Sequence, residues 1–137
     1  MQNYDLAFII SSIQQFWRIP VRIYKNGERQ RTDFSFPLEI DPFEETAQEL
    51  LESVHHIDYV ITKFFELYGI VSDGRTAIVL GPVGYYKLDP QRFQEYMFLV
   101  GISDRKEVDE HIKALKNIPK LSLEFFMHIL CFLNYFL

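Results

Sequence analysis

Few residues of this chain could bind a metal ion or act on a substrate. His55 and His56 are adjacent, so their side chains would point to opposite faces of a strand or lie about 100° apart on a helix. Neither arrangement lets the pair chelate one metal ion, and we expect one packed and one exposed histidine. His111 and His128 fall on separate expected helices without a cysteine or carboxylate at ligand spacing. We expect both to be structural.

Cys131 and a group of glutamates are the other side chains with reactive potential. Cys131 lies in an apolar segment, where a thiol packs as a small hydrophobic side chain with little thiolate character. Three acidic residues, Glu45, Glu49 and Glu52, suggest metal or acid–base chemistry, but helical glutamates far more often point to water. The chain contains no G-x-S-x-G, H-E-x-x-H or dinucleotide-binding pattern. The sequence therefore predicts no catalytic residue, no cofactor and no metal.

Length and composition favour one domain that spans residues 1–137. The chain has 137 residues, of which 48% are hydrophobic and 16% aromatic, enough for one real core and too few for two ordinary domains. A net charge of −5 argues against nucleic-acid binding by the overall electrostatic field. A single cysteine fits a reducing compartment, and we expect a cytoplasmic protein.

Basic residues are concentrated near one expected hairpin at 21–36, which turns at Asn26-Gly27. The group consists of Arg18, Arg22, Lys25, Arg29 and Arg31. Because no aromatic residues alternate with these cations, a solvated hairpin explains them better than an anion or DNA site.

Three strands are predicted in the centre of the chain, at 58–64, 66–71 and 76–80. They are rich in β-branched and aromatic residues, and Asp73-Gly74 supplies the tight turn before the last. The segment Ala77–Leu80 is apolar without alternation, which is typical of a strand covered on both faces. Helices from elsewhere in the chain must then pack on it, and Gly81-Pro82 predicts a kinked exit from the strand.

Helices are predicted around this sheet. The first runs from Asn3 to Ile19, before Pro20, and an acidic one runs from Asp41 to Ser53. Two more begin at Asp89-Pro90 and at Asp104, and the former ends at Gly101. The residues expected on their buried faces are Leu6, Ile9, Ile10, Ile13, Phe16, Trp17, Phe43, Ala47, Leu50, Leu51, Val54, Phe93, Tyr96, Met97, Val100, Val108, Ile112 and Leu115.

The last segment, residues 121–137, is apolar nearly all round. It is shorter than the roughly 20 apolar residues of a membrane span and contains polar side chains, so we expect no membrane insertion. It must dock on the sheet or on another subunit, and its abrupt end suggests a longer protein. If it is a dimer interface, the candidate residues are Phe125, Ile129, Phe132 and Phe136.

Aromatic residues of the expected sheet could line a cavity for a small molecule. The candidates are Tyr59, Phe64, Tyr68 and Tyr85. Each could equally be a core residue, because aromatic side chains dominate both cores and ligand pockets.

The predicted order of helix, hairpin, helix, three-strand meander and further helices resembles the PAS/GAF-like sensor plan. Two stretches, FELYGIVSDGRTAIVLGPV (65–83) and NIPKLSLEFFMHILCFLNYFL (117–137), resemble the N-terminal sensory region of bacterial AraC-family transcriptional regulators. The resemblance implies an α+β fold with an antiparallel sheet of about five strands, the first hairpin beside the last strand, flanking helices and an apolar C-terminal helix. It also implies a sensor or dimerisation fragment whose DNA contact lies in a domain beyond Leu137. We therefore expect a homodimer, either with a small-molecule ligand or without one.

Three functions follow as hypotheses. The first is a regulatory sensor that binds a small molecule or a partner and passes the signal through residues 121–137 to a DNA-binding domain outside the chain. The second is a dimerisation module without a ligand. The third is a small standalone enzyme, which has the least support because no acid–base pair can be named.

Overall fold

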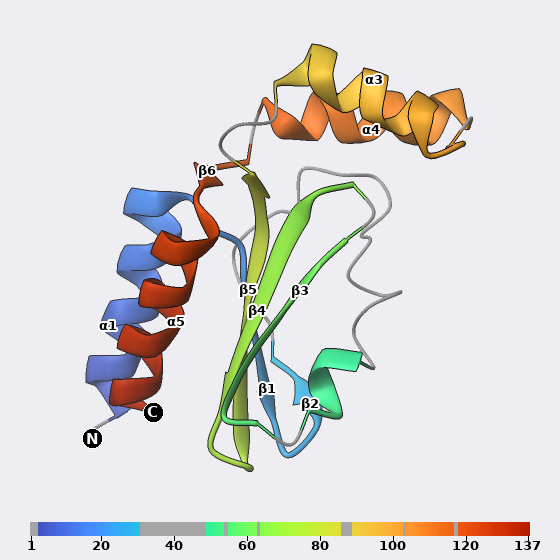
Figure 1. Ribbon diagram of the computed structural model, residues 1–137. Coiled ribbons are helices and arrows are strands. Elements are labelled where there is room, and N and C mark those ends of the chain that lie inside the picture. Colours follow the sequence, from blue (N-terminus) through green and yellow to red (C-terminus); the bar gives the residue numbers. More distant parts are fainter. Residues whose placement is uncertain are drawn as a thin grey trace.

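The structure is a computed structural model that describes residues 3–30, 49–53, 55–62, 64–85, 89–102, 104–116 and 118–137. Its helices are α1 (Asn3–Ser12), which continues into the π-helical turn η1 (Ile13–Trp17), then α3 (Pro90–Leu99), α4 (Arg105–Leu115) and α5 (Leu123–Phe136). Its strands are β1 (Val21–Lys25), β2 (Glu28–Arg29), β3 (Ile57–Ile61), β4 (Glu66–Ser72), β5 (Thr76–Tyr85) and β6 (Lys120–Leu121). A sheet stands at the centre, with α1 and α5 along one face and α3 and α4 beyond one end (Figure 1).

The strands pair in the order β2-β1-β5-β4-β3, and every pair in this series is antiparallel. The first hairpin therefore lies beside the last strand of the meander, as expected. One short strand, β6, pairs in parallel with the end of β5, a contact that the sequence analysis did not predict. The expected α+β class, an antiparallel sheet of about five strands flanked by helices, is confirmed.

The helices α1 and α5 bury one face of the sheet. Side chains alternate along a strand, and the residues of this face are Val21, Leu67, Val71, Ile78, Leu80 and Val83, which form one core with Ile10, Ile13, Phe126, Leu130 and Leu133. On the opposite face, Val79 packs with Tyr24, Leu50, Tyr68 and Ile70. The segment Ala77–Leu80 is thus buried on both faces, as its apolar run predicted.

A third cluster holds the hairpin of α3 and α4 against the end of the sheet. It consists of Phe64, Phe93, Met97, Val108 and Ile118. The carboxylate of Asp89 accepts a hydrogen bond from the backbone N–H of Arg92 (2.8 Å) at the start of α3, and Gly101 has a φ of 79° at its end. Both helix boundaries were predicted from the sequence.

Several expectations about buried faces were wrong. Phe16 and Trp17 are exposed because the π-helical turn changes the spacing at the end of α1. Tyr96 and Val100 are exposed, since α3 presents only one narrow stripe to α4. Leu51 is also exposed while its neighbour Leu50 is buried, as adjacent helical positions cannot share one face.

The strand does not end at Gly81-Pro82 as predicted, because β5 continues to Tyr85, but Gly81 has a φ of 134°, which agrees with the predicted kink. The pairing of β4 with β5 shifts register between Leu67 and Gly69 and then resumes. The turn at Asn26-Gly27 is confirmed by positive φ angles of 51° and 81°. Residues 31–36 of the expected hairpin and 41–48 of the expected acidic helix lie outside the described residues.

Gly69 allows α5 to approach β4 closely. A Cβ atom at this position would lie 2.5 Å from Leu130 Cδ1. We expect Gly69→Ala to lower the free energy of unfolding by about 1–3 kcal/mol, because the added methyl group overpacks the contact. Urea unfolding followed by circular dichroism measures this loss.

A double-mutant cycle provides the control. Leu130→Ala alone should cost about 2–5 kcal/mol, because it leaves a cavity. The methyl group of Gly69→Ala would partly fill that space, so the double variant should lose less than the sum of the single losses. Strictly additive losses would contradict the proposed contact.

The turn between β4 and β5 depends on Asp73. Its carboxylate accepts hydrogen bonds from the backbone N–H groups of Thr76 (2.7 Å) and Arg75 (2.9 Å), which lower the pKa of Asp73 below its ordinary value. A carboxyl group whose pKa is lowered by folding stabilises the protein above its unfolded pKa of about 3.9, and the contribution is lost as the pH falls through the folded value.

We expect Asp73→Ala to cost about 1 kcal/mol at neutral pH, from the lost hydrogen bonds. The difference from the parent protein should shrink below about pH 4, as urea unfolding at several pH values will measure. Asp73→Asn keeps an uncharged acceptor and should lose less. A difference that is the same at every pH would contradict the role of the ionised carboxylate.

Candidate functional site

The described residues contain no group of three or more His, Cys, Asp or Glu side chains that could hold a metal ion. His55 and His56 are both exposed, so the expectation that one of them is packed was wrong. His56 reaches the edge of the sheet, where its Nδ1 lies 2.9 Å from the carbonyl oxygen of Ser72. Cys131 is exposed on α5, although the apolar segment predicted a packed thiol.

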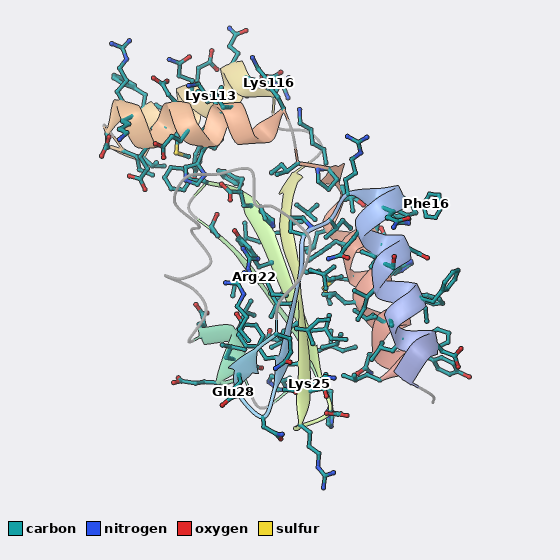
Figure 2. All side chains as sticks on the ribbon, turned by 180° about the vertical axis from the view of Figure 1, so that it is seen from behind. Phe16, Arg22, Lys25, Glu28, Lys113 and Lys116 are labelled. Atoms are coloured by element: carbon teal, nitrogen blue, oxygen red, sulfur yellow. The ribbon has the colours of Figure 1, made fainter. Side chains whose placement is uncertain are left out.

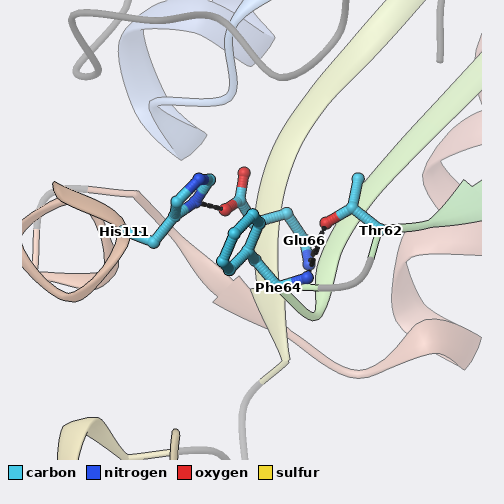
Figure 3. A network of polar contacts seen from close by, with 4 residues as sticks. All are labelled: Thr62, Phe64, Glu66 and His111. Atoms are coloured by element: carbon cyan, nitrogen blue, oxygen red, sulfur yellow. Dashed lines mark hydrogen bonds and ion pairs between the residues drawn. The ribbon is translucent and has the colours of Figure 1, made fainter. Parts of the chain in front are cut away.

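One buried polar pair joins the sheet to the α3–α4 hairpin. His111 on α4 contacts Glu66 on β4 through Nδ1 and Oε1, and both side chains are at least 94% buried. The ring of Phe64 stacks on the imidazole with centroids 3.6 Å apart. Figure 3 shows this group together with Thr62, whose hydroxyl oxygen accepts hydrogen bonds from the backbone N–H groups of Phe64 and Glu66.

The pair positions α4 and is closed to substrates. An imidazole beside a carboxylate is a common acid–base arrangement, but this one is covered by Phe64 and the surrounding core. The burial of His111 agrees with its predicted structural role, but its carboxylate partner Glu66 could not be predicted because it lies 45 positions away in the sequence.

Three of the four predicted ligand-binding aromatics have described side chains, and these three are not brought together. Tyr68 is fully buried on the face of the sheet opposite α5. Tyr59 is aligned with Gly69 on the face that α5 covers and is partly exposed, and Phe64 belongs to the α3–α4 cluster. Tyr85 ends β5, and its side chain lies outside the described part. The three described side chains therefore have separate surroundings.

The sequence predicted that Arg22 belongs to a solvated basic hairpin, and this expectation was wrong. Its side chain is only 2% exposed, and Nη1 donates a hydrogen bond to the carbonyl oxygen of Gly81 (3.1 Å). Its guanidinium lies over the ring of Tyr68, 5.7 Å from the centroid, in a cation–π arrangement. Figure 2 shows Arg22 in the middle of the sheet and Lys25 near the end where β1 turns into β2. Arg22 therefore holds β1 to β5 as a structural cation.

An exposed apolar surface runs along the two terminal helices. We define the α1–α5 surface by the large side chains that α1, η1 and α5 expose together: Phe8, Phe16, Trp17, Phe125, Phe132 and Tyr135. Phe8 is 74% and Phe132 is 56% exposed, and the rings of Trp17 and Phe125 pack across the two helices with centroids 5.2 Å apart. Phe16, labelled in Figure 2, projects outward from the end of this helix pair.

A groove of about 430 Å³ follows this surface between the two helices. Its lining includes Phe8, Ile9, Trp17, His128, Ile129 and Phe132. Two of the predicted interface residues, Ile129 and Phe132, thus lie in the groove, and Phe125 and Phe136 flank it through ring contacts with Trp17 and Phe132. Their use as an interface remains a prediction.

The residues of α5 that alternate with this stripe face the sheet. Phe126, Leu130 and Leu133 have no measurable exposure. Ser122 caps the helix by accepting a hydrogen bond from the backbone N–H of Phe125 (3.1 Å). Among the described residues, none of the helices combines the length and the apolar character needed to cross a bilayer.

We expect His111→Ala to release the α3–α4 hairpin from the sheet. Removal of one member of a buried polar pair typically costs about 3–5 kcal/mol, and this change also removes the stacking on Phe64. Hydrogen exchange should accelerate in residues 105–115 while β4 and β5 stay protected. Asp109→Ala, on the exposed side of the same helix, should leave exchange unchanged. Unchanged protection of α4 in His111→Ala would show that the pair does not hold the hairpin.

Comparison with known proteins gives no relative from which a function could be transferred. No family model, no curated protein and no solved structure matches this chain.

Proposed function

We propose that this chain is a regulatory domain that associates with a second copy through the α1–α5 surface and passes changes in its sheet to that interface. The observation that carries the proposal is the two-sided environment of α5. One side of the helix is buried against the sheet, and the other side, with Phe125 and Phe132, is apolar and exposed. A ligand or partner that favours one packing of α5 would therefore favour one form of the interface.

The chemistry of the α1–α5 surface supports a second copy as its partner. In a two-fold dimer the same patch meets itself, so an apolar patch is complementary to its own copy. Among the described residues, those that line its groove include no Lys, Arg, Asp or Glu. A large apolar patch of this kind is typical of a binding surface, and its aromatic side chains are those enriched at interfaces.

The connection between α5 and the rest of the domain supports a regulatory role. The two residues of β6 pair with Gly84 and Tyr85 at the end of β5, and α5 begins two residues later. The hairpin that precedes β6 is held by Glu66 and His111. The start of α5 is thus tied to the sheet on one side and to the α3–α4 hairpin on the other.

The resemblance of residues 65–83 and 117–137 to AraC-family sensory regions supplies the context of the proposal. In that context the domain acts in a cytoplasmic transcriptional regulator, and a separate domain that follows α5 contacts DNA. The net charge of −5 supports the assignment of DNA contact to another domain. The pairing of β1 beside β5 is the arrangement that the PAS/GAF-like plan implies.

We expect Phe125→Glu and Phe132→Glu to convert a dimer into a monomer, because each change buries a carboxylate in an apolar interface. A central aromatic residue of an interface is worth about 2 kcal/mol or more, so the dissociation constant should rise at least about 30-fold. Sedimentation equilibrium over a range of concentrations measures it.

Phe98→Glu is the matched control. Phe98 is 84% exposed but lies on α3, away from the α1–α5 surface (Figure 1), so this variant should remain dimeric. A parent protein that is monomeric throughout, or a dimer that only Phe98→Glu dissociates, would contradict the proposal.

Hydrogen exchange in α5, measured with and without metabolite mixtures, then separates a sensor from a constitutive dimerisation module, in which exchange stays constant.

A further inference from the structure

A second groove lies between the first half of α1 and the ends of β1 and β5. It has a volume of about 370 Å³, which is within the range of small-molecule sites. Figure 1 shows that the N-terminal end of α1 and the β1–β2 and β4–β5 turns lie at the same end of the domain. The wall that α1 contributes includes Leu6, Ala7 and Ile10.

The register of β1 and β5 gives the groove an apolar floor and places basic residues at one end of it. Ile23 is aligned with Ile78, and Lys25 is aligned with Thr76. Aligned residues of antiparallel strands lie on the same face, and all four line the groove. Arg75 also lines it, and its carbonyl oxygen accepts a hydrogen bond from the backbone N–H of Asn26 (2.8 Å). Two cationic residues therefore lie at one end of an apolar floor.

No acidic residue is among the described residues that line this groove. Asp73 lies beside Arg75 and interacts with its charge, and its carboxylate accepts hydrogen bonds from the backbone N–H groups of Arg75 and Thr76. Glu28 is aligned with Lys25 on β2 and is exposed. In a chain with a net charge of −5, Lys25 and Arg75 are the charged residues of the described lining and make a local site for an anion.

We propose that this groove binds a small molecule with an apolar body and a single carboxylate, such as a medium-chain fatty acid. The apolar body lies on Leu6, Ile10, Ile23 and Ile78, and the carboxylate lies between Lys25 and Arg75. The proposal does not depend on self-association, because the groove is on the opposite side of α1 from Phe8 and Ile9, which line the groove of the α1–α5 surface.

The test compares three probes of equal chain length on the full chain: octanoate, octanol and octylammonium. We expect octanoate to bind most tightly, octanol more weakly and octylammonium least, as measured by calorimetric titration. The overall charge of the protein would favour the cation, so this order can arise only from a local basic site. Amide chemical shifts should change at residues 6–10, 23–26 and 75–78. Equal affinities, or shifts confined to α5, would overturn the proposal.

Substitutions identify the two ends of the site. Lys25→Gln and Arg75→Gln should each weaken octanoate binding roughly two- to fivefold and leave octanol unaffected. Lys106→Gln, an exposed cation on α4, is the matched control and should not change either affinity. Ala7→Trp places a large side chain in the groove from an exposed helical position and should abolish both. Octanoate affinity that survives the Lys25→Gln, Arg75→Gln double variant would overturn the role of the cations.

The same titration separates this proposal from the proposed function. Phe132→Glu should remove self-association and keep octanoate binding, whereas Ala7→Trp should remove binding and keep the dimer. Loss of octanoate binding in Phe132→Glu would place the ligand in the α1–α5 groove and overturn the assignment to Lys25 and Arg75.

Discussion

The close approach of α5 to the sheet is the contact on which the rest of the structure depends. Gly69 lies between Tyr59 on β3 and Leu80 on β5, and its missing side chain leaves room for Leu130 and Phe126. At this separation the helix packs on β4 and β3, and its buried side chains form one core with residues of α1, β1 and β5. Burial of this face is the main source of stability that the described residues offer, and the position of α5 is fixed by it.

As a consequence, the inner side of α5 cannot move without moving its exposed outer side as well. Its inner residues interlock with a core that is packed on both faces of β5, and such cores are not continuously deformable. A different seating of α5 would move the aromatic side chains on its outer side as one unit. In the proposed function this rigidity would let α5 carry a signal from the sheet to its exposed apolar side.

The sequence predicted the positions of helices and strands better than the burial and long-range contacts of their side chains. Strand propensity and turn residues located β3, β4 and β5, and caps located α3, because these signals are local. The burial of Arg22 could not be predicted, since it arises from Tyr68 and from Gly81, 59 positions away. The same holds for His111 and Glu66, whose pairing depends on how the α3–α4 hairpin meets the sheet. Periodicity assigned Phe16 and Tyr96 to buried faces, but the width of a buried stripe is set by the partner element.

The two grooves differ in what the sequence could reveal. The residues proposed for an interface were selected as an apolar stripe on a single helix, and the structure places two of them in the groove and two beside it. The basic groove combines residues from α1, β1 and the β4–β5 turn, and only the alignment of Ile23 with Ile78 and Lys25 with Thr76 brings them together. The aromatic residues proposed for a ligand cavity were selected by type, without knowledge of which sheet face each would occupy.

The pairing of β1 with β5 also sets the order in which the chain can fold. The strands β3, β4 and β5 follow one another with short turns, so they can pair early, whereas β1 must close a much longer loop before it gains any contact. The helices α1 and α5 come from opposite ends of the chain, and one face of the sheet stays open until both have arrived. During synthesis from the N-terminus, α1, β1 and the meander must therefore wait with their apolar face uncovered until residues 123–136 have emerged from the ribosome.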